Sequence, residues 1–314
     1  MKEIWIIVIL AAVLLLLLAA AGFFLLDFTC GRRKAENPWD PEYLRKRGLG
    51  AWTEDILAGK RFMEEQQTEE LEIRSEDGLR LRGIFVPREN ARGTLLLFHG
   101  WRSSWKMDFG MALPFYHSLG LNLLLVDERA QGRSEGKYIT YGVKERKDLA
   151  RWVSCMAEKL GKEAPLLLGG LSMGAATVLM ASDTAFDANV RGIIADCGFT
   201  TPYAIIRHVA GKTKGIPLNL STALLELFTR SLAGFGLKDA STVEALKRTK
   251  LPVLFIHGLA DDFVPPEMSK ESYQACVSEK ELVLVEGAAH GMSYPVDRER
   301  VQRKLREFVD RRLA

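Results

Sequence analysis

The chain opens with an unbroken apolar run from Ile4 to Leu26 that contains no charged residue. As a helix, these 23 residues are long enough to cross a bilayer core of about 30 Å. A cleavable signal peptide is the alternative, but its apolar part is usually about 7–15 residues long. A core helix would keep a polar face. The run therefore predicts an uncleaved transmembrane anchor within residues 1–35.

Positive charge on either side of this run indicates its orientation. Lys2 precedes the run, whereas Arg32, Arg33 and Lys34 follow it. Because flanking Lys and Arg stay on the cytoplasmic side, we expect a single-pass protein of the cell membrane with its main domain in the cytoplasm. A secreted or extracytoplasmic domain is the alternative. Scattered cysteines without a CxxC pair fit free thiols in a reducing compartment, namely Cys30, Cys155, Cys197 and Cys276.

A polar segment, residues 36–68, follows the anchor and carries irregularly spaced aromatic and aliphatic residues. This pattern predicts one or two short helices that link the anchor to a domain over residues 69–314. Trp39 and Trp52 either rest at the lipid interface, where tryptophan is enriched, or pack on the surface of that domain.

The remaining chain shows the periodicities of alternating strands and helices. LEIRS and LRLRGIFV alternate apolar and polar positions around Asp77-Gly78, which predicts a β-hairpin. Short apolar runs without alternation are typical of strands buried on both faces of a parallel sheet, and they lie at Thr94–Phe98, Leu121–Val126, Leu166–Leu168, Val190–Ala195, Val253–Ile256 and Leu282–Val285. Helical patterns separate them, at about 105–118, 142–160, 173–182, 265–276 and 295–312. We expect an α/β fold, a mostly parallel central sheet with helices on both faces.

One connection between strands is too long for a simple crossover. It runs from Gly198 to Leu251 and contains apolar helical patterns at Tyr203–Val209 and Leu218–Phe235. Long inserts above a parallel sheet are usually lids or substrate caps. The sequence therefore predicts a helical cap over about residues 199–250.

Candidate chemistry begins at Gly170-Leu171-Ser172-Met173-Gly174, between a predicted strand and a predicted helix. This G-x-S-x-G pattern is typical of a sharp turn that exposes a serine and needs small residues on either side of it. The start of the following helix places a positive dipole end near the serine. Ser172 is therefore the candidate nucleophile.

A serine nucleophile needs a base, and the base needs an orienting acid. Asp261 and Asp262 follow one predicted strand, and His290 follows the next. Both segments lie beyond the carboxyl ends of parallel strands, where open α/β sheets place their sites. The order Ser, Asp, His is the one expected for this turn. His99 and His257, each beside glycine at a strand end, are expected to be structural.

In combination, these motifs resemble the α/β-hydrolases, particularly the branch with S33 aminopeptidase-like proteins, S9 peptidase-like proteins and small bacterial esterases. The resemblance also rests on Phe98-His99-Gly100 and on the stretch from Asp127 to Ser134, in which Ala130 replaces the usual glycine. It implies Asp261, rather than Asp262, as the acid, and His290 as general base and acid. It further implies an oxyanion hole from two backbone N–H groups, those of Trp101 and Met173.

Composition narrows the remaining function classes. The net charge is +3, from 43 Lys and Arg against 40 Asp and Glu, which argues against nucleic acid as a partner. The five histidines are dispersed and no phosphate-binding glycine loop occurs, so we expect no metal and no nucleotide cofactor.

The expected activity is hydrolysis of a small-molecule acyl substrate, a carboxylic ester or thioester, through an acyl-enzyme on Ser172. The alternatives are a small-peptide serine peptidase and a catalytically idle binding module of the same fold.

Overall fold

The computed structural model describes residues 1–34 and 37–314 and places its strands in one sheet of order β1-β2-β4-β3-β5-β6-β7-β8. The two antiparallel pairs are β1–β2 and β2–β4, and every pair from β3 to β8 is parallel. The predicted hairpin and mostly parallel sheet are thereby confirmed. The strands are β1 (Glu69–Arg74), β2 (Arg80–Val86), β3 (Gly93–Phe98), β4 (Leu121–Asp127), β5 (Leu166–Leu171), β6 (Val190–Asp196), β7 (Val253–Gly258) and β8 (Lys280–Val285).

Two apolar layers cover the sheet, because successive side chains of a strand point to opposite faces. In β4, Leu123 and Leu125 enter one layer, whereas Leu124 and Val126 enter the other. The first layer is closed by α4 (Trp105–Asp108), α5 (Leu113–Ser118) and α13 (Arg298–Leu313). The second is closed by α6 (Glu145–Leu160), α7 (Met173–Met180) and α11 (Pro266–Ala275). Helices therefore lie on both faces, as the apolar runs predict.

The segment after the anchor packs on the domain. It forms α2 (Pro41–Lys46) and α3 (Thr53–Glu65), and α3 lies against the short helix Gly110–Ala112. The Trp39 ring meets the Trp105 ring edge-on with centroids 5.7 Å apart. The domain surface is therefore the environment of Trp39. The predicted boundary between anchor and linker, at residues 35 and 36, lies outside the described residues.

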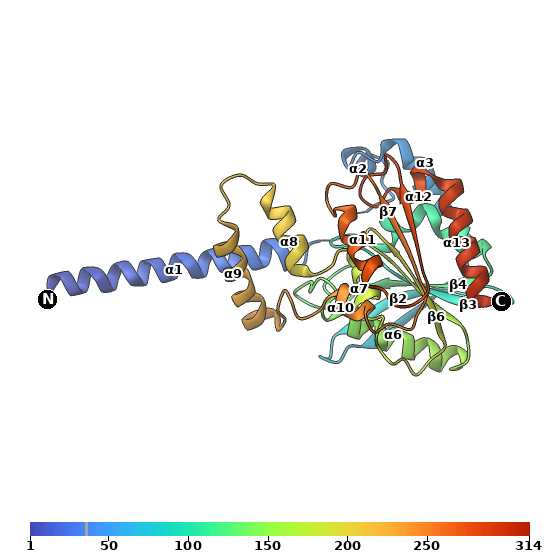
Figure 1. Ribbon diagram of the computed structural model, residues 1–314, viewed down its shortest axis with the longest axis horizontal. Helices are drawn as coiled ribbons and strands as arrows, with labels where there is room; N and C mark the ends of the chain where they lie inside the picture. The colour runs from blue at the N-terminus through green and yellow to red at the C-terminus, as the bar shows by residue number, and fades with distance from the viewer. Residues whose placement is uncertain (35–36) are drawn as a thin grey trace.

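The long connection between β6 and β7 contains two kinds of helix. Cap helices α8 (Pro202–Gly211) and α9 (Leu218–Phe228) stand away from the sheet, followed by a π-helical turn at Thr229–Ala233 (Figure 1). A further helix, α10 (Thr242–Leu246), packs against α7 and α11. The last part of the predicted cap interval therefore lies in the body of the domain, because Leu246 belongs to the sheet's apolar layer.

The apolar N-terminal run forms one helix, α1 (Lys2–Cys30), that projects from the domain (Figure 1). It is long and apolar enough to cross a membrane, and its most apolar stretch is exposed, which excludes a core helix. The same properties are shared by membrane anchors and signal sequences. Only its last turns are buried, at Gly22, Leu26 and Cys30, where α1 packs against α9.

Candidate active site

Ser172 occupies a strained turn between β5 and α7. Its φ of 57° and ψ of −112° are unusual for a residue with a side chain. Close packing explains the neighbouring glycines. A Cβ at Gly174 would lie 1.8 Å from the Phe98 carbonyl oxygen, and one at Gly170 would lie 2.3 Å from the Gly174 carbonyl. The Ser172 N–H donates to the Asp196 carbonyl at 2.8 Å, which joins the turn to β6.

The structure brings together the three side chains singled out in the sequence. His290 Nε2 lies 2.9 Å from Ser172 Oγ, and His290 Nδ1 lies 2.7 Å from Asp261 Oδ2. Asp262 points into solvent, with 93% of its side chain exposed, toward Lys212. Loops after β5, β7 and β8 therefore meet in one hydrogen-bonded chain, which ends at Asp261 and leaves out Asp262.

Asp261 is held as a carboxylate by its surroundings. Oδ1 accepts hydrogen bonds from the N–H groups of Phe263 and Val264, at 3.0 and 2.9 Å. Burial alone would raise the pKa of Asp261, but hydrogen bonds from His257 and His290 outweigh burial and lower it. A charged carboxylate keeps the His290 proton on Nδ1, so Nε2 is free to accept the proton of Ser172.

His257, expected to be structural, is also a partner of the acid. It is fully buried, its Nδ1 lies 2.6 Å from Ser269 Oγ, and its Nε2 lies 2.9 Å from the Val264 carbonyl. The same Nε2 lies 3.2 Å from Asp261 Oδ2. His257 thus fixes both the loop that carries Asp261 and the carboxylate itself. In the sequence, this role is indicated by the position of His257 four residues before Asp261.

The loop after β3 carries Trp101, one of the two expected oxyanion donors, and is held by an acid that the sequence did not single out. Asp108 Oδ2 accepts a hydrogen bond from the Gly100 N–H at 2.6 Å, and Asp108 also accepts one from the Ser103 hydroxyl. A Cβ at Gly100 would lie 3.3 Å from the Ser172 Cβ. The loop therefore passes directly over the nucleophile.

The end of α1 rests on this same loop. Trp101 Nε1 donates to the Thr29 carbonyl at 2.9 Å, and the Tyr141 hydroxyl donates to the same oxygen at 2.9 Å. Arg102 Nη2 donates to the carbonyls of Phe28, at 2.7 Å, and Gly31, at 3.1 Å. The last carbonyls of a helix have no partner within it. Trp101 and Arg102 of this loop, together with Tyr141, supply the partners here.

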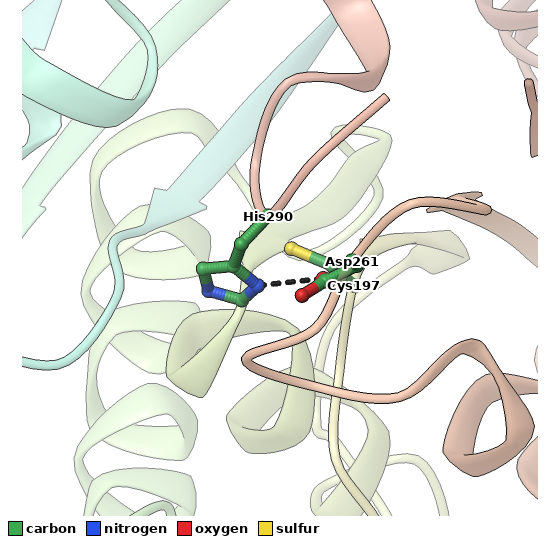
Figure 2. A group of neighbouring side chains, drawn as sticks. All are labelled: Cys197, Asp261 and His290. Atoms are coloured by element: carbon green, nitrogen blue, oxygen red, sulfur yellow. Dashed lines mark hydrogen bonds and ion pairs between the residues drawn. The ribbon is translucent and has the colours of Figure 1, made fainter. Parts of the chain in front are cut away.

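Cys197 lies beside the acid and the histidine (Figure 2). Its Sγ, a carboxylate oxygen of Asp261 and a ring nitrogen of His290 lie within 4.8 Å of one another, a cluster that resembles a metal site. However, burial raises the pKa of the Cys197 thiol well above its usual value, whereas metal binding requires a thiolate. Asp261 is already engaged by His290 and two N–H groups. The groups of Cys197, Asp261 and His290 therefore fit a hydrogen-bonded carboxylate better than a metal-binding site.

The architecture is the α/β-hydrolase fold. A family model described as the alpha/beta hydrolase fold matches residues 93–234. The esterase Pf2001 of Pyrococcus furiosus superposes with a TM-score of 0.66 at 22% identity, covering 91% of this chain and 97% of its own. The chain therefore has the α/β-hydrolase fold, and these findings support its place in that superfamily.

Individual relatives extend the comparison. The uncharacterized protein YqkD of Bacillus subtilis is 27% identical over 241 residues, which is 76% of this chain and 78% of YqkD. The uncharacterized membrane protein YNL320W of Saccharomyces cerevisiae is 23% identical over 215 residues, 67% of this chain and 68% of its own. The chain is thus similar to proteins of which one is described as a membrane protein.

Proposed function

We propose that this protein is a membrane-anchored serine hydrolase that cleaves carboxylic esters with Ser172, His290 and Asp261. The observation that carries the proposal is the chain of hydrogen bonds from Asp261 through His290 to Ser172, at 2.7 and 2.9 Å. It leads to a serine on a strained turn at the start of a helix. This linked arrangement of a serine, a histidine and a carboxylate supports nucleophilic catalysis.

In the first half of the reaction, Ser172 Oγ bonds to the ester carbonyl carbon while His290 Nε2 takes the hydroxyl proton. The N–H groups of Trp101 and Met173 donate to the resulting oxyanion. When this intermediate collapses, the bond to the alkoxy group breaks and the alcohol leaves with the proton from His290. In the second half, water loses a proton to His290 and attacks the acyl group, the acid departs, and Ser172 regains its proton.

Apolar side chains around the serine support an acyl substrate. Met173 is fully buried in a cluster that includes Leu225 of the cap, and Trp101 and Phe263 pack against that cluster. The Phe263 ring lies 5.0 Å from the His290 ring. Apolar surroundings of this kind favour a hydrocarbon group next to the reacting carbonyl.

Covalent labelling tests the proposed nucleophile. The full-length protein in detergent is exposed to a fluorophosphonate probe, and we expect labelling that disappears in Ser172→Ala. Ser154→Ala is the matched control, because Ser154 is exposed on α6 and its hydroxyl donates to the Ala150 carbonyl of the same helix. Folded wild-type protein that stays unlabelled would favour an idle binding module. Labelled protein that cleaves peptides but no ester would contradict the ester class.

The anchor completes the proposal. We expect α1 to remain in the mature protein and cross the membrane, with the hydrolase domain in the cytoplasm, because Arg32, Arg33 and Lys34 follow the apolar run. Alkaline phosphatase fused after Ala314 should be inactive in a bacterial host, since that enzyme requires export. An active fusion would place the domain outside.

A further inference from the structure

The cap helix α9 exposes an apolar stripe. Leu220 and Leu227 are 56% and 59% exposed, and Ala223 between them is exposed as well. Their spacing of three and four residues puts all three on one face of the helix. Leu232, in the π-helical turn that follows, is 46% exposed. A helix of a soluble domain normally turns such a face inward.

The opposite side of α9 packs on α1, the candidate membrane helix (Figure 1). A Cβ at Gly22 would lie 2.2 Å from the Phe228 ring, and the Phe23 and Phe228 rings meet edge-on at 5.1 Å. The apolar run of α1 ends at Leu26. At 1.5 Å per residue, the contact therefore falls within about the last 6 Å of that run.

The position of the α1–α9 contact along α1 indicates which environment surrounds the exposed stripe of α9. An anchor of this length spans the hydrocarbon core, so a helix packed against its last apolar turns lies at the edge of that core. The exposed rings at the same level of α1 belong to Phe23, Phe24 and Phe28. Exposed apolar side chains of α9 and exposed aromatic rings of α1 therefore lie on two helices that pack together at this end of the apolar run.

These two helices connect to the nucleophile through buried apolar residues. Leu26 of α1, Leu225 of α9 and Met173, next to Ser172, belong to a single cluster. Trp101 packs against it and donates to the Thr29 carbonyl of α1. These three residues are fully buried, so the cluster holds α9 and the end of α1 in a fixed position next to the residue that follows Ser172.

We infer that α9 sits in the edge of the bilayer and that the substrate is a long-chain acyl ester resident in the membrane. This inference rests on the proposed ester hydrolysis and adds the source and length of the acyl chain. The apolar stripe docks the cap into the lipid, which keeps Ser172 and the loop of Trp101 beside the membrane surface where the ester resides.

Two substrates and matched variants test the inference. Full-length protein in phosphatidylcholine vesicles is given either a long-chain acyl ester embedded in the same bilayer or a soluble acetate ester. We expect Leu227→Glu to lower kcat/KM on the embedded ester at least tenfold and to leave the acetate ester within twofold. Val277→Glu, at a position 67% exposed beyond α11 and away from the cap, should change neither rate.

The outcomes separate this inference from the proposed function. Wild-type protein that cleaves neither ester would refute the proposed function itself. If the acetate ester is cleaved and Leu227→Glu leaves the embedded ester unaffected, the inference is wrong. If Leu227→Glu lowers both rates, the milder variant Leu220→Gln is assayed on the same two esters. A loss of activity on the embedded ester alone supports the inference. Any other result with this variant overturns it.

Discussion

Replacing Asp261 with asparagine should lower kcat for ester hydrolysis by about 10⁴-fold, because a neutral amide no longer holds the His290 proton on Nδ1. His290 Nε2 would then carry the proton and could not accept one from Ser172. The adjacent Asp262→Asn should stay within about twofold of wild type, since the Asp262 side chain is 93% exposed and faces Lys212.

The pair is informative because the two substitutions are chemically identical and one residue apart. Both variants should be purified as full-length protein and assayed on the soluble acetate ester, with circular dichroism to show that each is folded. A large loss in Asp262→Asn together with full activity in Asp261→Asn would reverse the assignment. Equal, small losses in both would mean that no carboxylate in this loop orients His290.

The second large effect is expected on stability, from a substitution in the turn that carries Ser172. Gly174→Ala should destabilise the protein by roughly 3–5 kcal/mol, because overlap with a packed backbone is among the most costly changes. The new Cβ would lie 1.8 Å from the Phe98 carbonyl oxygen, which belongs to the buried strand β3. Either β3 or the Ser172 turn must move, so activity should fall together with the melting temperature.

Gly211→Ala provides the control for this change. Gly211 ends the cap helix α8, and a Cβ there would meet only Leu218 Cδ1, at an ordinary 3.6 Å. Alanine favours a helix over glycine by up to about 1 kcal/mol, so this variant should melt at the wild-type temperature or slightly above. Thermal unfolding of both variants in the same detergent measures the contrast. Similar melting of Gly174→Ala and wild type would contradict the close packing of this turn.

Local sequence patterns predicted the sheet, its flanking helices and the loops that carry Ser172 and His290. The strands could be recognised because burial on both faces leaves predominantly apolar runs without alternation, such as Leu121–Val126. The turn could be recognised because close backbone packing requires glycine at Gly170 and Gly174. The strands and the turn depend on residues close together in the chain, so a short stretch of sequence is enough to predict them.

Contacts between distant segments could not be predicted in this way. Asp108 holds the loop at Gly100 from a short helix whose sequence, WKMD, carries no catalytic pattern. The bond from Trp101 to Thr29 joins positions 72 residues apart, and its acceptor is a backbone carbonyl that any residue would provide. The packing of α10 on α7 likewise depends on tertiary contacts.

The capping of α1 by Trp101, Arg102 and Tyr141 has a practical consequence for enzymology. Soluble material is commonly prepared by deleting an apolar N-terminal helix. Here, deletion of residues 1–31 would remove the carbonyls of Phe28, Thr29 and Gly31 that these side chains bind. The trimmed protein would keep Ser172, His290 and Asp261 but lose these contacts of the loop that carries Trp101. Rates measured on such material would describe a chain without these contacts, so full-length protein in detergent or nanodiscs is the appropriate starting point.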